Sequence, residues 1–61
     1  MIILNTLTGK KKKFGNMDAL IGEYFLMSTD EKLVSVVAFM EGDKKRILDY
    51  PSMMIYMLEN L

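Results

Sequence analysis

The side chains of this chain that could carry out chemistry are lysines, carboxylates, tyrosines and serines, because its 61 residues include no His and no Cys. Without His the commonest acid–base catalyst is missing, and without Cys no thiolate can ligate a metal or form a disulfide. Ser28, Ser35 and Ser52 therefore have no imidazole to activate them as nucleophiles. The sequence predicts a protein that is not an enzyme and has no catalytic residue, no metal ligand and no cofactor.

Glycine and lysine are concentrated between Gly9 and Gly15, which reads Gly-Lys-Lys-Lys-Lys-Phe-Gly. A phosphate-binding P-loop needs a glycine–lysine–hydroxyl order that leads into a helix, and this segment lacks that order. Acidic residues are paired at two expected turns, around residues 30–31 and 41–43, without the spacing of a calcium loop. We interpret these carboxylates as solvated turn residues.

Seven of the eight basic residues lie in two short segments, residues 10–13 and 44–46, each predicted to lie in the return half of a β-hairpin. With Phe14 and Ile47 turned the other way, alternate basic residues would share one face of the sheet. These candidate nucleic-acid contacts are Lys11, Lys13, Lys44 and Arg46. Such a stripe could track phosphates. Lysines on edge strands also block edge-to-edge aggregation, and no base-stacking aromatic residues alternate with them.

Residues 53–61 are apolar around the whole circumference of a predicted helix, with only Glu59 and Asn60 polar. An all-round apolar helix should be buried all round, yet a domain of about 60 residues buries only about 60% of its unfolded surface. Methionine is common at adaptable interfaces. The predicted interface for self-association or a partner consists of Met53, Met54, Ile55, Tyr56, Met57, Leu58 and Leu61. The alternative is a generously packed monomer core with tolerated exposed Met.

The elements that must position these residues follow from hydrophobic periodicity. They are strands at 2–8 and 11–14, a helix after Asn16, strands at 33–40 and 44–49, and a helix at 53–61. They predict an α+β fold, a small ββαββα unit with an antiparallel sheet and two helices on one face. The alternative is an all-β small barrel with a C-terminal helix, which requires residues 20–28 to form a strand.

The chain is predicted to be a single small domain, residues 1–61, whose two halves resemble each other at an offset of 33 residues. Gly9 matches Gly42, and Asn16 matches Asp49 at the expected start of each helix. Two hairpin–helix half-repeats, 1–27 and 33–61, would explain this match. Two ordinary hairpin–helix units with a coincidental likeness would explain it too.

Charge and hydropathy indicate in which compartment the protein is expected and whether it has a membrane partner. Eight basic and eight acidic residues cancel, and no apolar run approaches the ~18–20 residues that cross a bilayer. The opening residues lack the basic region of a secretory signal, so we expect a cytoplasmic protein with no membrane partner. The small size and the lack of catalytic side chains would suit a small regulator or inhibitor, such as those that phages and mobile elements encode.

Two functions are consistent with these features. The first is a non-catalytic interaction protein that self-associates as a homo-oligomer, most simply a homodimer, and regulates or inhibits another protein by binding it. The alternative is a nucleic-acid-binding regulator that uses the two basic β-hairpins. A purely structural subunit of a larger assembly is a third.

Overall fold

An open antiparallel sheet and three helices make up the computed structural model, which describes residues 1–60. The elements are, in chain order, β1 (Ile2–Thr6), β2 (Lys11–Phe14), α1 (Met17–Leu26), α2 (Thr29–Leu33), β3 (Ser35–Glu41), β4 (Lys44–Leu48) and α3 (Tyr50–Glu59). The predicted α+β fold is confirmed. The barrel alternative is not supported, because the sheet is open and residues 20–26 are helical.

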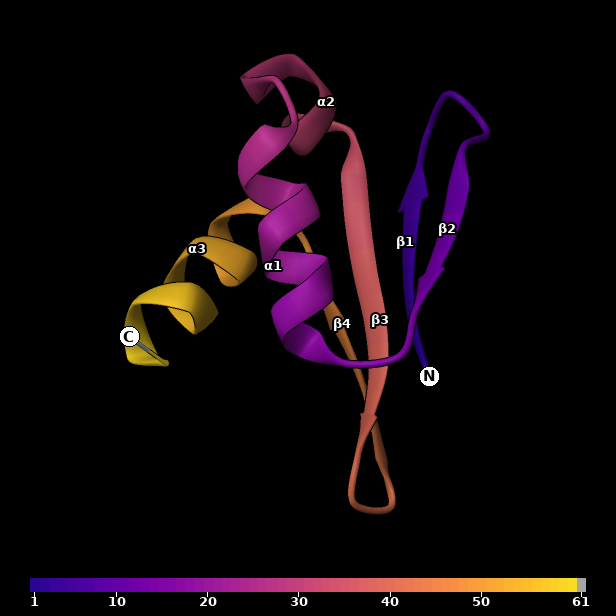
Figure 1. Cartoon of the computed structure of the whole chain (residues 1–61), viewed down its shortest axis with the longest axis vertical. Coiled ribbons are helices and arrows are strands. Elements are labelled where there is room, and N and C mark those ends of the chain that lie inside the picture. The colour runs from indigo at the N-terminus through magenta and orange to yellow at the C-terminus, as the bar shows by residue number, and fades with distance from the viewer. Residues whose placement is uncertain (61) are drawn as a thin grey trace.

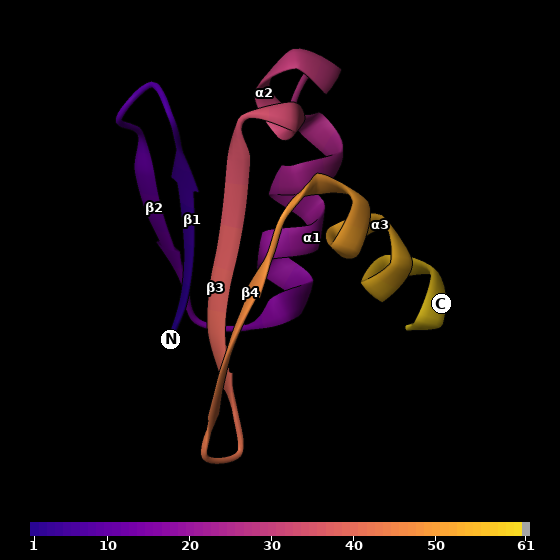
Figure 2. The same cartoon turned by 180° about the vertical axis from the view of Figure 1, so that it is seen from behind.

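The strand order in the sheet is β2-β1-β3-β4, so each hairpin contributes one central and one edge strand. Figures 1 and 2 show that α1 and α3 cover the same face of the sheet, while α2 lies at one end of β3. Helix α1 packs against β1 and β2, and α3 packs against β3 and β4. The other face of the sheet is not covered by any element of residues 1–60.

The core lies between the sheet and the two long helices, where alternate strand residues meet the inner side of each helix. Its buried apolar side chains are Ile2, Leu4, Leu20, Tyr24, Val37, Phe39, Leu48 and Met53. Leu20 and Met53 are both 0% exposed, and each follows its helix cap by four residues. Burial raises the pKa of the Tyr24 hydroxyl above its ordinary value.

Both long helices begin at a side-chain cap. The Asn16 Oδ1 atom accepts a hydrogen bond from the Ala19 N–H at 2.8 Å, and Asp49 Oδ1 accepts one from the Ser52 N–H at 3.0 Å. The bond from Ser52 holds the pKa of the Asp49 carboxyl below its usual value. The stabilisation from this cap is therefore present above the usual pKa and is lost as the pH falls through the lowered one.

Several element boundaries differ from the prediction, and among the strand ends β1 ends at Thr6 rather than at residue 8 and β4 at Leu48 rather than at residue 49. Helix α3 begins at Tyr50 rather than at residue 53, because Asp49 supplies the cap and the following proline fits the first turn. Residues 28–32, predicted to be a polar break, belong mostly to α2, whose cap Ser28 accepts a hydrogen bond from the Glu31 N–H at 3.3 Å. The strand expected from residue 33 consequently begins at Ser35.

The two hairpins have loops of different length, which decides where their side chains point. Five residues, 6–10, separate the paired residues Asn5 and Lys11, whereas two residues, 42–43, separate Glu41 and Lys44. Gly42 has a φ of +64°, as a tight hairpin turn requires. Because the loops differ by three residues, an odd number, corresponding positions of β2 and β4 face opposite sides of the sheet.

Candidate functional site

An apolar groove runs between α1 and α3 on the outer side of the helix layer. This helix groove encloses about 480 Å³ and is lined by Asp18, Ile21, Phe25, Lys32, Met54, Met57, Leu58 and Asn60. Phe25 and Leu58 are 64% and 70% exposed, so they project from its walls into solvent. A soluble chain rarely leaves clustered large apolar side chains exposed, and such patches mark interaction sites.

Six of the seven predicted interface residues lie in helix α3, where they have three different environments. Met53 belongs to the core, while Met54, Tyr56 and Met57 are half-buried and pack against it. Only Ile55 and Leu58 are exposed. Leu61 lies outside the described residues. The helix is thus buried on one side. Met54, Met57 and Leu58 contribute to one wall of the helix groove, whereas the exposed Ile55 does not line it.

The other wall of the helix groove comes from α1 and was not predicted as an interface. Ile21 and Phe25 lie four residues apart, the spacing of the apolar stripe of an amphipathic helix, which is typical of core positions. The neighbouring Leu26, also exposed, lies on what should be the polar side of an amphipathic helix. That irregularity of the stripe was the available signal.

The uncovered side of the sheet is a second candidate surface, here called the open sheet face. Strand alternation and the register assign to it Ile3, Asn5, Lys11, Lys13, Val36, Ala38, Met40, Lys45 and Ile47. Its centre is aliphatic, and Ile47 is 61% exposed. A shallow hollow of about 320 Å³ lies over this centre.

Lysine is the only charged residue type on the open sheet face among residues 1–60. Lys11 and Lys13 lie on the β2 edge and Lys45 on the β4 edge. Seven of the eight acidic residues lie elsewhere, on the helices, in turns or on the helix side of β3, whereas Asp49, which follows β4, borders this face and lines a hollow with Asn5 and Val36. The face therefore combines an aliphatic centre with a positive rim.

The predicted stripe of four basic residues is wrong in its second half. Lys11 and Lys13 share the open sheet face, with Phe14 turned towards the core, as expected. In β4 the assignment is reversed, because the shorter β3–β4 loop shifts the register by an odd number of residues. Lys44 and Arg46 consequently lie on the helix side, and Ile47 lies on the open side.

Arg46 has a structural environment that the sequence did not indicate. Its guanidinium lies 5.9 Å from the ring centroids of both Phe39 and Tyr56, and these rings contact each other edge to face. Its Nη1 atom is 3.4 Å from Glu41 Oε2. The guanidinium therefore covers the end of the core nearest α3.

We predict that Arg46→Gln lowers the free energy of unfolding by about 0.5–1 kcal/mol, because the contacts with both rings are lost. The matched change Lys45→Gln, one residue earlier on the open sheet face, is expected to stay within about 0.5 kcal/mol of wild type. Urea denaturation of the two variants at equal protein concentration provides the measurement. Equal midpoints for the two variants would contradict the assignment of Arg46 to the helix side.

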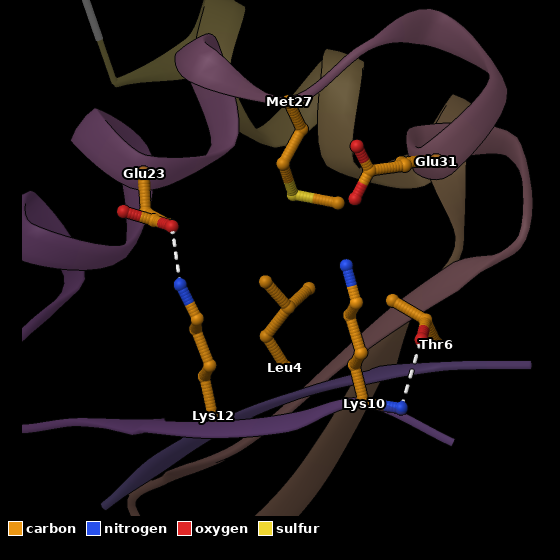
Figure 3. A pocket seen from close by; sticks show the side chains of 7 residues that line it. All are labelled: Leu4, Thr6, Lys10, Lys12, Glu23, Met27 and Glu31. Carbon is orange, nitrogen blue, oxygen red and sulfur yellow. Dashed lines mark hydrogen bonds and ion pairs between the residues drawn. The ribbon is translucent and has the colours of Figure 1, made fainter. Parts of the chain in front are cut away.

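Acidic and basic side chains also lie close together around a smaller hollow. Figure 3 shows it between the first hairpin and the helices, with Lys12 and Glu23 paired across it. The Lys12 Nζ atom is 2.6 Å from Glu23 Oε1. The hollow encloses about 80 Å³, well below the ~300 Å³ of typical small-molecule sites. We interpret this pair as a surface ion pair that ties β2 to α1.

Residues 1–60 include no group of three acidic, His or Cys side chains placed to hold a metal ion. None of the helices in this part of the chain has the length and apolar character needed to cross a membrane.

Comparisons with known proteins give no relative for this arrangement. No family model matches the chain, and neither a curated protein nor a solved structure matches it.

Proposed function

We propose that this protein is a non-catalytic interaction protein that self-associates as a dimer and regulates or inhibits another protein by binding it. The observation that carries the proposal is the helix groove, an exposed apolar surface built from two helices. An apolar surface of this kind gains free energy when a second apolar surface removes it from water.

A second copy of the chain is the occupant that the groove fits best. The projecting Phe25 and Leu58 would remain in solvent around a small ligand inside the groove, whereas a second protein surface covers them. The groove also carries one acidic and one basic residue, Asp18 and Lys32, so its net charge does not repel a copy of itself. A two-fold contact of this kind is the commonest way in which soluble proteins self-associate.

The open sheet face is less suited to self-contact. Two copies that met through this face would bring six lysines together, against only the two Asp49 carboxylates that border the faces. In a dimer formed through the helix groove, both sheet faces point outwards and stay accessible. This arrangement leaves one surface for self-association and one for the regulated target.

Light scattering on the purified protein tests the proposal. At about 50 µM we expect the mass of two chains, since homodimers held by apolar contacts are commonly stable at micromolar concentration. The apolar contact should also resist added salt. A mass of one chain at this concentration would contradict self-association. Turnover that co-purifies with the protein and is abolished by one substitution of an Asp, Glu, Lys or Tyr would contradict the non-catalytic part.

The alternative function, nucleic-acid binding, has weaker support. Of its four candidate contacts, Lys11 and Lys13 point to the open sheet face, but Lys44 and Arg46 do not. The three Phe and three Tyr residues of the chain also contribute no side chain to that face, so bases would have no ring to stack on. A steep salt dependence of binding to labelled duplex DNA or single-stranded RNA would favour this alternative.

A further inference from the structure

The open sheet face has an excess of positive charge, although the chain as a whole is neutral. Three of the eight basic residues lie on this face, which leaves five basic against eight acidic residues on the rest of the protein, a net charge of −3. The positive charges lie at both edges, with Lys11 and Lys13 on β2 and Lys45 on β4. Between these edges lie apolar side chains of the two central strands, Ile3, Val36, Ala38 and Met40, and Ile47 adds a further one on the β4 edge.

The dimensions of this face match those of one α-helix. The two edge strands are three strand spacings apart, about 14 Å. A helix with its side chains is about 10–12 Å wide, so it fits over β1 and β3 between the two lysines of the β2 edge and Lys45 on the β4 edge. Strand β3 has seven residues and spans about 23 Å, which is the length of a helix of about 15 residues.

We propose that the open sheet face binds an amphipathic helix of another protein, one whose apolar stripe is flanked on both sides by carboxylates. The apolar stripe covers the aliphatic centre, and the carboxylates meet the lysines of both edges. Binding would cover the second face of the sheet with a helix, as α1 and α3 cover the first. The inference deepens the proposed function, on which it rests, by giving the chemistry of the target.

Other anionic partners fit this surface less well. Nucleic acid would place phosphates and bases over aliphatic side chains, without aromatic residues for stacking. A membrane would gain only about 1 kcal/mol per lysine, and the central Ile3 and Ala38 are already half-covered by their neighbours. A helix can pack on side chains of this kind because its own apolar residues reach down between the lysines.

The test uses a labelled 15-residue peptide held helical by a side-chain staple, with a leucine stripe flanked by glutamates. A control peptide has glutamine in place of every glutamate. Each is titrated to about 1 mM, a range that detects weak binding, into the ¹⁵N-labelled full-length chain. We expect the amide signals of Ile3, Val36, Ala38, Met40 and Ile47 to shift with the acidic peptide, and the control peptide to bind at least about tenfold more weakly.

Matched charge reversals locate the site. The variant K13E/K45E changes one lysine on each edge of the open sheet face, and we expect it to weaken peptide binding by at least about tenfold. The control K10E/K44E makes the same change of charge outside this face, and we expect less than about a threefold loss. Circular dichroism establishes that both variants keep the wild-type helix content.

Several outcomes would overturn the inference. They are no shift of open-face amides at the highest peptide concentration, an equal loss in both variants, or shifts confined to the helix groove. Tighter binding to single-stranded RNA, duplex DNA or anionic vesicles, abolished in K13E/K45E, would assign the face to nucleic acid or membrane instead. A one-chain mass together with open-face shifts would contradict the proposed dimer and support the helix site, so the two failures are distinguishable.

Discussion

Replacing Leu20 with Ala is expected to lower the free energy of unfolding by about 2–5 kcal/mol. Leu20 is 0% exposed and belongs to the core between α1 and the sheet, so the truncation leaves a cavity there. A core of this size rarely supplies more than ~3–5 kcal/mol. Much of the Leu20→Ala protein should therefore be unfolded at 25 °C.

The control for this experiment is the same substitution at an exposed site. Leu7 is 86% exposed, and Leu7→Ala is expected to change the free energy of unfolding by no more than about 0.5 kcal/mol. Urea denaturation followed by circular dichroism compares the variants at one protein concentration, because self-association adds concentration-dependent stability. Similar midpoints for Leu20→Ala and Leu7→Ala would mean that Leu20 is not in the core.

The double variant Phe25→Lys/Leu58→Lys is expected to convert the dimer to a monomer at about 50 µM. Two ammonium groups on each copy would have to be buried or brought close together at the contact, and an unpaired buried charge costs several kcal/mol. Both residues project into solvent from α1 and α3, so the fold of the single chain should be retained. Light scattering gives the mass, and circular dichroism gives the helix content.

A matched double variant separates this effect from a general effect of added charge. Leu7→Lys/Leu33→Lys adds the same two charges at exposed leucines that do not line the helix groove. We expect it to keep the mass of two chains. If both double variants dissociate, or if neither does, the contact between copies does not involve the helix groove.

Local signals in the sequence were sufficient to predict the four strands and the two long helices in their order, but not the short helix α2. Asn16 and Asp49 marked the starts of the long helices, because each side chain can accept a backbone hydrogen bond three residues later. Gly9 and Gly42 marked the two hairpin loops, and both have a positive φ. These signals act within a few residues, so they do not depend on how distant segments pack.

The faces of β4 could not be predicted from the same signals. The offset of 33 residues aligned Arg46 with Lys13, but the alignment ignored the pairing within each hairpin. Pairing depends on how many residues the loop contains, and a difference of three reverses every side chain. The α1 wall of the helix groove was not predicted either, because the position of Phe25 in the helical repeat is that of a core residue, whereas the side chain is exposed.

Because the turn between β3 and β4 has two residues, the same register that buries a leucine in the core also determines on which face each basic residue of β4 lies. Leu48 must face the helices to fill the core, and alternation then fixes Lys44 and Arg46 on that side and Lys45 on the other. A one-residue change in turn length would exchange these positions only by exposing Leu48. The packing of Leu48 therefore also fixes which basic residues of β4 lie on the open sheet face. Of the three, only Lys45 does, so only a substitution there changes the positive charge of that face while the register is kept.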